Sequence, residues 1–331
     1  MTEPITVAKL AEIAGVSIPT VSKVLNRRKG VAEPTREAVE DAIRTTGYVR
    51  RPRGGRPGAG IVDLLIAGID SQWAFALMQG VSAEAQRLGL EVIVTANAAD
   101  ADAQEAWLQR MVARGSDGVI VAVAEMPGQV SAELREREVP VVLIDPVGAR
   151  APALPTISAT NWAGGLSATE HLLELGHRRI GIITGPEDEM CSLDRLDGYS
   201  AALRRAGIAL DTALIRHGDS LVSGGKLHGG TLLDLEDPPT AVFSCSDEQA
   251  YGVYEAAAER GLKVPKHLSV VGFDDVNLCQ WISPQLTTVR QPLAEMGAAA
   301  VRRVANPSDM GRLELPTSLV IRKSTAHPFI R

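Results

Sequence analysis

The chain has 331 residues, 45% of them hydrophobic and 22% charged, which is the composition of a globular protein long enough for about two domains. Its beginning, Met1 to Lys9, is polar and charged, and no apolar run approaches the roughly 18 residues of a membrane span, so we expect neither a signal peptide nor a membrane protein. The three cysteines, Cys191, Cys245 and Cys279, are too far apart for a disulfide framework or a CxxC metal site, so we expect a cytoplasmic protein with no cofactor and no metal.

Basic residues are concentrated at the N-terminal end. Residues 1–60 contain 11 lysines and arginines against 6 acidic residues, a net charge of +5, whereas the remainder contains 23 against 34, a net charge of −11. A small basic region on a large acidic body indicates that the basic region meets a polyanion. Chance clustering gives the same imbalance, so charge by itself does not establish DNA binding.

Residues 1–48 are expected to form three short helices, because their apolar residues recur at spacings of three and four. Gly15 breaks the first helix, Ser17 stands where it caps the second, and Pro19 lies in that helix's first turn. A helix, a sharp turn and a helix that opens with small polar residues are typical of a helix-turn-helix unit, whose second helix enters the DNA major groove. Three short amphipathic helices also form other small domains, so spacing does not decide between them.

Residues 49–60, VRRPRGGRPGAG, contain no large apolar residue after Val49 and mix glycine and proline with arginine. Nothing in this stretch can pack against a core. We therefore expect a flexible basic linker over 50–60, between a DNA-binding domain (1–49) and a larger core (61–331).

From Ile61 the chain alternates short apolar runs with amphipathic segments. The runs, which are typical of buried parallel strands, are IVDLLIAGI, LEVIVTA, DGVIVAVA, PVVLID, IGIITG, TAVFSCS and LSVVGFD. This alternation predicts the α/β class: an N-terminal all-α helix-turn-helix head and a two-lobed core of doubly wound parallel sheets. Ligands of such sheets bind at the carboxyl ends of the strands, so residues just after each run are candidates for a binding site.

The N-terminal residues resemble a known family. The run VAKLAEIAGVSIPTVSKVLN (7–26), followed by VAEPTR (31–36) and Gly47-Tyr48, is similar to the head of the lactose repressor/galactose repressor (LacI/GalR) family, and its AGVSxxTVSxVLN pattern is long and specific. The resemblance implies base-reading positions at Ile18, Pro19 and Lys23. The other expected DNA-binding residues, mostly at phosphates, are Thr6, Ser17, Thr20, Ser22, Asn26, Thr35 and Tyr48.

The side chains of Ile18 and Pro19 cannot form hydrogen bonds. We therefore expect apolar contacts there, for example with thymine methyl groups, and donation from Lys23 to a guanine. The alternative is that these residues only pack the head. One departure from the family is Lys9, where an acid is usual.

The linker also departs from the family, whose typical members form a helix after the tyrosine and insert a leucine into the minor groove. Here the stretch has no leucine, and its prolines and glycines disfavour a helix. The segment PRGGRP (52–57) is close to the PRGRP core of minor-groove AT-hook segments, so Arg53 and Arg56 are candidates to grip A·T-rich minor grooves. A flexible basic tether with general phosphate attraction is the alternative.

The core also resembles that of the LacI/GalR family, which has the two-lobed architecture of sugar-binding proteins. The matching segments are HLLELGHRRIGIITGP (171–186), RLDGYSAAL (195–203), SDEQAYG (246–252), VVGFDD (270–275) and PQLTTVRQP (284–292). The resemblance implies crossings between the lobes near 158–163, 286–291 and 318–322. The implied lobe 1 spans about 61–160 and 289–319, and lobe 2 about 161–288 and 320–331.

The core offers several candidates for binding an effector. Asp145 and Asp274 each follow a strand, where a carboxylate accepts from ligand hydroxyls, and Arg195 offers a rigid fork for two ligand oxygens. In the family the residues at the positions of Arg195 and Asp274 commonly hold the effector. The remaining candidates, next to strands or lobe crossings, are Asp70, Ser71, Trp73, Trp162, Ser246 and Asp247. The family often has Asn in place of Ser246, which puts that contact in doubt.

Structural alternatives stand beside these assignments. Arg195 and Asp274 could pair with each other to hold the lobes together. Trp73 and Trp162 could belong to the core or a dimer interface, and Asp247 could cap the helix after its strand. If they line a cleft, the acids and tryptophans favour a carbohydrate over an apolar effector.

The sequence contains no GxxxxGK[ST] phosphate loop, GxSxG elbow or clustered metal ligands, so we do not expect an enzyme. A transport-type binding protein would share the core and lack the head. We therefore predict a transcriptional repressor that binds a pseudo-palindromic double-stranded DNA operator as a homodimer and responds to a mono- or oligosaccharide. A dimer is expected because no heptad tail follows the SLVIRKS segment before Arg331. Whether the effector releases DNA or promotes binding is open from the sequence.

Overall fold

The computed structural model describes residues 7–25, 31–46, 59–96, 101–122, 128–145, 154–307 and 311–329. The chain divides into two compact units, Met1–Arg56 and Pro57–Arg331. The helices of the first unit are α1 (Val7–Ile13), α2 (Ile18–Leu25) and α3 (Glu33–Thr46). The elements of the second unit are, in chain order, β1 (Ile61–Ile66), α4 (Gln72–Leu88), β2 (Glu91–Ala96), α5 (Ala101–Arg114), β3 (Gly118–Ala122), α6 (Gly128–Glu136), β4 (Val141–Ile144), β5 (Thr156–Ala159), α7 (Asn161–Glu174), β6 (Ile180–Thr184), α8 (Met190–Arg205), the 3-10 turn η1 (Thr212–Leu214), β7 (Ile215–His217), α9 (Val222–Leu233), β8 (Ala241–Ser244), α10 (Asp247–Glu259), β9 (Ser269–Asp274), α11 (Leu278–Trp281), β10 (Thr287–Arg290), α12 (Leu293–Ala305), β11 (Arg312–Leu315) and β12 (Ser318–Val320).

In the first unit, the three helices enclose a small apolar core. Its buried residues are Leu10, Ala11, Val21, Val24, Val39 and Ala42. Gly15, in the turn between α1 and α2, has a φ of +64°, a conformation that glycine adopts without the cost a side chain brings. Ser17 caps α2 as the sequence predicts, because its Oγ accepts the Thr20 N–H at 3.3 Å. The expected succession of helix, sharp turn and helix is confirmed.

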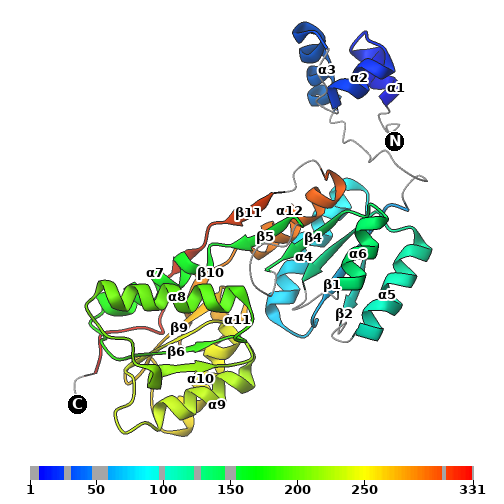
Figure 1. Ribbon diagram of the computed structural model, residues 1–331. Coiled ribbons are helices and arrows are strands. Elements are labelled where there is room, and N and C mark those ends of the chain that lie inside the picture. The colour runs from blue at the N-terminus through cyan, green and yellow to red at the C-terminus, as the bar shows by residue number, and fades with distance from the viewer. Residues whose placement is uncertain are drawn as a thin grey trace. The chain divides into compact units, whose positions relative to one another are not determined.

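The second unit contains two six-stranded sheets, each of which defines one lobe (Figure 1). The sheet of lobe 1 has the strand order β11-β5-β4-β3-β1-β2, and all of its neighbouring strands are parallel. Helices cover both faces of such sheets, which explains why β1 and β3 are almost continuously apolar.

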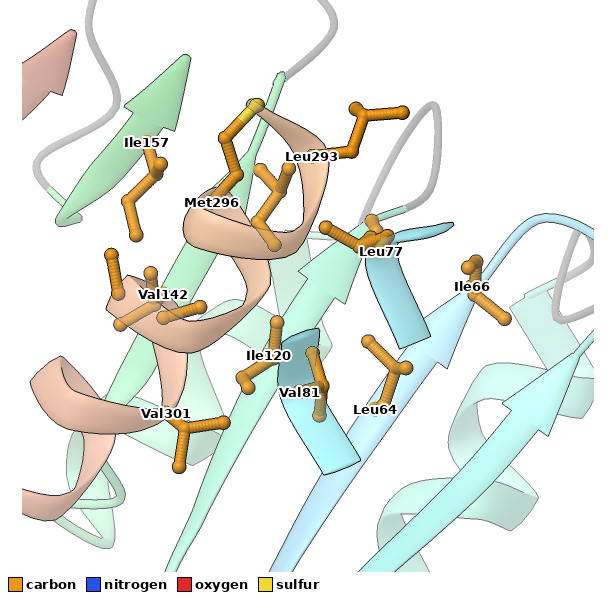
Figure 2. Packing of buried hydrophobic residues seen from close by; sticks show 14 of the residues in the cluster. Leu64, Ile66, Leu77, Val81, Ile120, Val142, Ile157, Leu293, Met296 and Val301 are labelled. Carbon is orange, nitrogen blue, oxygen red and sulfur yellow. The ribbon is translucent and has the colours of Figure 1, made fainter. Parts of the chain in front are cut away.

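Helices α4 and α12 cover one face of the lobe 1 sheet. Figure 2 shows Met296 of α12 and Val81 of α4 in one cluster with Ile120 and Val142 of the strands. On the other face, α5 and α6 contribute to a second cluster around the fully buried Trp107. The lobe therefore has the two helical layers of a doubly wound fold.

The sheet of lobe 2 has the order β12-β10-β9-β8-β6-β7, and only β12 is antiparallel to its neighbour. Helices α7 and α8 pack with one face of this sheet, and α9 and α10 pack with the other. The predicted architecture of two doubly wound lobes is confirmed.

The chain crosses between the lobes after β5, after β10, and between β11 and β12. Two of these crossings are joined by Thr160 and Thr317, since the Thr317 N–H donates to Thr160 Oγ1 at 2.9 Å. The sequence places the second segment of lobe 1 at about 289–319. Ladder hydrogen bonds keep β10 beside β9 through Arg290, and β12 joins the lobe 2 sheet from Ser318.

Candidate functional site

A cavity of about 220 Å³ opens between the two lobes of the second unit. The strands that reach it do so at their carboxyl ends, where doubly wound sheets bind ligands. Lobe 1 contributes Ala67, Ser71, Trp73, Ala122, Ile144 and Asp145 to its lining. Lobe 2 contributes Glu189, Cys191, Arg195, Ser220, Leu221, Ser246, Glu248, Asp274 and Val276.

Arg195 is held rigidly in the cavity wall by lobe 2. Its side chain is only 6% exposed, and its guanidinium lies 3.8 Å from the centre of the Phe273 ring. Nε donates to Asn161 Oδ1 at 2.9 Å, and Nη1 donates to the Cys245 carbonyl oxygen at 2.5 Å. Among the described residues, Nη2 is then the guanidinium nitrogen without a fixed acceptor, and the stacked ring fixes the plane in which it donates.

Close packing of α7 on α8 places Arg195 in this position. A Cβ on Gly165 would lie 2.3 Å from the Arg195 carbonyl oxygen, and a Cβ on Gly198 would lie 2.2 Å from the Trp162 carbonyl oxygen. Only glycine allows the two helix backbones to approach this closely. The DGYSAAL part of the RLDGYSAAL segment therefore positions the arginine that precedes it.

Asp145 and Asp274 enter the cavity from opposite lobes. Burial raises the pKa of Asp145 to about 6, and Arg195 offsets part of that rise. Burial also raises the pKa of Asp274 well above its usual range, again against the influence of Arg195. Gln291 donates to Asp274 Oδ1 at 2.6 Å, whereas Oδ1 of Asp145 is buried and has no hydrogen-bond partner among the described residues. Both carboxyls therefore retain capacity to bind a ligand.

Helix N-termini supply the rest of the polar lining. Ser71 caps α4 by accepting the Ala74 N–H at 3.1 Å, and Ser246 caps α10 by accepting the Gln249 N–H at 3.0 Å. Glu248, in the first turn of α10, accepts the backbone N–H of Gln72 at 2.7 Å. This bond joins the two lobes at the edge of the cavity.

Unfavourable backbone conformations cluster at the cavity. Of the non-glycine residues with positive φ in the described ranges, Asp145 (+41°), Ser220 (+66°) and Asp274 (+117°) line it, and Asp275 (+58°) adjoins it. Such conformations cost about 1–3 kcal/mol each and occur preferentially at functional sites. This clustering identifies the cavity as a candidate functional site independently of the chemistry of its side chains.

The cavity brings together most of the residues selected from the sequence. Ser71, Trp73, Asp145, Arg195, Ser246 and Asp274 line it. The considered pairing of Arg195 with Asp274 is not seen, because Arg195 is bonded to Asn161 and Cys245 instead.

Three of the selected residues do not line the cavity. Asp70 is exposed beside it. Trp162 is 40% exposed, and the guanidinium of Arg205 lies 5.9 Å from its ring centre. Asp247 is fully buried, where it accepts from Thr288 Oγ1 at 2.5 Å and from the Val276 N–H at 2.9 Å. Its carboxylate thus ties α10 to the β9–β10 region.

Sequence reasoning missed Glu189, Glu248, Ser220 and Cys191. Glu189 precedes α8 and Glu248 opens α10, both in segments that follow a strand of lobe 2. The available indication was the rule that ligands bind beyond strand ends, applied to the whole connecting segment rather than to its first residue.

The first unit presents a second candidate surface on α2. Ile18 is 43% exposed, and Pro19 and Lys23 are also exposed, so none of them belongs to the apolar core of the head. Ser17 and Thr20 lie beside them, with hydroxyl oxygens 2.8 Å apart, and Thr35 is half-buried at the start of α3. Thr6, Asn26, Tyr48, Arg53 and Arg56 lie outside the described residues, as does the side chain of Ser22.

Comparison with known proteins identifies both units. Residues 6–51 match the family described as "Bacterial regulatory proteins, lacI family", and residues 169–325 match "Periplasmic binding protein-like domain". The HTH-type transcriptional repressor CytR of Escherichia coli (strain K12) is 33% identical over 328 residues, covering 97% of this chain and 96% of the relative. The chain belongs to the lacI family. As a member of this family it is a regulatory protein and not an enzyme, and the resemblance stated from the sequence is confirmed.

Two solved structures of regulators are similar to this chain over nearly its full length. The complex described as "transcriptional regulator CelR-cellobiose complex" has a TM-score of 0.74 and 30% identity, covering 97% of this chain and 99% of that one. The lac repressor dimer bound to operator and the anti-inducer ONPF has a TM-score of 0.72 and 27% identity, covering 98% of this chain and 100% of that one. Within the described ranges, no helix is long and apolar enough to span a membrane.

Proposed function

We propose that this protein is a cytoplasmic transcriptional repressor that binds a pseudo-palindromic DNA operator as a homodimer and is controlled by a sugar in the cavity between its lobes. The observation that carries the proposal is the combination of an exposed α2 surface on a basic head with a two-lobed core whose cavity is lined by hydrogen-bonding groups. Membership of the lacI family supports this combination, because the family consists of regulatory proteins and a similar relative is a transcriptional repressor.

On the DNA side, Ile18, Pro19 and Lys23 are the proposed base-reading residues. Their exposure speaks against a role in packing the head, since the core of the head is complete without them. Ile18 and Pro19 offer apolar contacts to thymine methyl groups, and Lys23 offers a donor to guanine. The proposed residues for phosphate and other DNA contacts are Thr6, Ser17, Thr20, Ser22, Asn26, Thr35 and Tyr48.

A homodimer follows from the energetics of DNA recognition. One small head makes too few contacts for tight specific binding, and two heads related by a two-fold axis match a pseudo-palindromic site. The lac repressor structure with a similar fold is a dimer on its operator.

On the effector side, the cavity offers carboxylates, hydroxyls and an arginine around the half-buried Trp73. Hydroxyl-rich ligands donate to carboxylates and accept from arginine, and an aromatic ring packs against the apolar face of a sugar. A similar regulator has been solved with cellobiose bound. We propose that sugar binding changes the closure of the lobes and releases the operator.

Fluorescence anisotropy tests this function. Purified protein would be titrated onto duplexes that tile the region upstream of its own gene, with and without a panel of sugars. Specific, salt-sensitive binding that one sugar relieves supports the proposal. Binding that no sugar alters would overturn the proposal of a sugar effector. The absence of any specific binding would overturn the proposal that the protein binds an operator in this region.

The base-reading assignment has its own test. Ile18→Ala should relax base preference at one position of each half-site, as measured by binding to single-base operator variants. Ile13→Ala is the matched control, because Ile13 is 48% exposed on α1 and is not assigned to DNA. An unchanged preference in Ile18→Ala would contradict the assignment.

For the linker we propose that Arg53 and Arg56 enter the minor groove in extended form, in place of the helix and leucine of typical members. The sequence supports this because PRGGRP combines arginines with residues that resist helix formation. The double substitution Arg53→Ala/Arg56→Ala should weaken operator binding and flatten its salt dependence. An equal loss of affinity for operators with A·T-rich and with G·C-rich flanking sequences would favour the alternative, a flexible basic tether attracted to phosphates in general.

A further inference from the structure

Buried carboxylates in the described parts of this chain are usually neutralised by arginine. Asp63 is fully buried and forms an ion pair with Arg114 at 2.5 Å. Asp275 accepts from Arg322 at 2.5 Å and from Arg290 at 2.7 Å. Glu84 likewise pairs with Arg87 and Arg302. In the same described ranges the fully buried Asp247 has no such ion pair, and it accepts hydrogen bonds from a hydroxyl and a backbone N–H instead.

The carboxylates that line the cavity differ from these ion-paired carboxylates. Four carboxylates line it, from Asp145, Glu189, Glu248 and Asp274, and within the described ranges none of them lies within 4.0 Å of a basic side chain. Arg195 is the basic residue among the described lining residues. It donates to Asn161 and to the Cys245 carbonyl oxygen, so its charge is shared by several carboxylates at a distance and paired with none.

The arrangement leaves specific atoms unsatisfied. Among the described residues, Oδ1 of Asp145 is buried without a hydrogen-bond partner, and Asp274, only 6% exposed, accepts from Gln291 through Oδ1. From the described part of the chain, Glu189 accepts a long bond from Ser192 Oγ at 3.3 Å and a weak thiol contact from Cys191 at 3.8 Å. The unpartnered Oδ1 of Asp145 and the weakly bonded carboxylate of Glu189 are costly to remove from water, so the site is suited to a ligand that brings hydrogen-bond donors and positive charge.

A bound metal ion does not meet this need. In the described parts of the chain, no group of three or more histidine, cysteine, aspartate or glutamate side chains is placed to hold one. Trp73 forms part of the wall, and an aromatic face attracts an organic cation as well as the apolar face of a sugar.

We infer that the effector is a polyhydroxylated amine, such as an amino sugar, whose ammonium group binds the carboxylates of Asp145 and Glu189 in the cavity wall. This inference rests on the proposed function, because it specifies the effector of the same cavity. It adds that a positive charge is part of recognition, and that neutral sugars and sugar phosphates are rejected in favour of the amine. A sugar phosphate would place its negative charge against the same carboxylates, and Nη2 of Arg195 offers it one donor against four carboxyl groups of the lining.

Matched ligands test the role of the charge. Isothermal titration calorimetry on the full-length protein at pH 7 would compare glucosamine, galactosamine and mannosamine with the parent sugars, their N-acetyl derivatives and their 6-phosphates. We expect one amine to bind at least about tenfold more tightly than its parent sugar and its N-acetyl form, because each of these lacks the ammonium charge. A neutral parent that binds as tightly as its amine overturns the inference, and so does a panel in which no amine binds.

Variants then locate the charge. Glu189→Gln and Asp145→Asn should each reduce the preference for the amine about tenfold, with folding checked by circular dichroism. Glu187→Gln is the matched control, because its carboxylate is 71% exposed in the same loop and does not line the cavity. An amine preference that survives both cavity substitutions would overturn the assignment of its site.

Operator binding separates this inference from the proposed function. If a neutral sugar binds and releases the operator, the proposed function stands and the charged effector is wrong. If neither amines nor neutral sugars change operator affinity, the proposed function itself fails.

Discussion

The hydrogen bond from Gln72 to Glu248 should control how readily the two lobes close. Gln72 is the first residue of α4 in lobe 1, and its backbone N–H donates to a carboxylate of lobe 2 over 2.7 Å. The bond also places a negative charge at the N-terminus of α4, where the helix dipole favours it. Glu248→Ala removes the acceptor from lobe 2.

Gln72→Pro removes the donor from lobe 1 and leaves the cavity lining intact. Proline is well tolerated at the first position of a helix, and it requires an extended residue before it. Ser71 has φ −86° and ψ 147°, which meets that requirement. The two substitutions therefore delete the same bond from opposite sides.

The expected loss follows from the geometry of the bond. A hydrogen bond to a charged group contributes about 1.5–3 kcal/mol, and the half-buried position of Glu248 argues for the lower half of that range. About 1.5–2 kcal/mol corresponds to a shift of roughly ten- to thirtyfold towards the open form. A ligand that needs both lobes should lose affinity by up to the same factor.

Pulsed electron paramagnetic resonance would measure closure, with one spin label on an exposed position of α5 and one on α9. Calorimetry would measure ligand affinity. We expect each single variant to populate longer distances, and the double variant to behave like either single one. Additive effects, or unchanged distances in Gln72→Pro, would refute the role of this bond.

Further substitutions probe the core and the cavity. Asp63→Asn should lower the free energy of unfolding by about 3 kcal/mol in urea titrations followed by tryptophan fluorescence, because it removes the buried charge that pairs with Arg114 and accepts from Trp107 Nε1. Gly165→Ala should lower the Tm by about 5 °C or more in thermal melts, because the added Cβ would lie 2.3 Å from the Arg195 carbonyl oxygen. Asp145→Asn should stabilise the ligand-free protein at pH 7 by about 3 kcal/mol, since burial raises the pKa of this carboxyl to about 6 in the native state, against about 3.9 when unfolded. The native state then binds the proton more tightly than the unfolded state, so the free energy of unfolding of the wild type falls as the pH rises from about 4 to about 6. Urea titrations should therefore show a more stable Asn variant at pH 7 and no such advantage below pH 4.

The strands and the ends of strands were predictable because they depend on local pattern. A run of apolar residues such as VVLI forms a buried strand wherever a sheet is available, and the chain must then leave the sheet at the next residue. Asp145 and Asp274 were found in this way, as residues that directly follow a strand or end it. The cap at Ser17 was equally local, because a hydroxyl bonds an N–H three residues away.

The position of Trp162 depended on the rotation of a helix. The buried residues of α7 include Asn161, Gly164, Gly165 and Ala168, a spacing that defines one helix face. Trp162 lies outside that face and is 40% exposed. Helical spacing applied to α7 would have shown this, whereas closeness to a lobe crossing did not.

The residues that escaped prediction reach the cavity through contacts between lobes or through strained backbone. Glu248 meets Gln72 only because two separately folded sheets come together, and no local pattern encodes that approach. Ser220 lines the cavity with a φ of +66°, a conformation that its own propensity opposes. Sequence reasoning follows local preference, so it fails where the fold overrides preference, which is also where functional sites concentrate. In this cavity the unpaired carboxylates and the strained residues coincide, so both reduce the stability of the ligand-free protein. A ligand that neutralises the carboxylates and holds the strained loops should therefore stabilise the native state by an amount set by its affinity and concentration, which links sensing directly to the unfolding equilibrium.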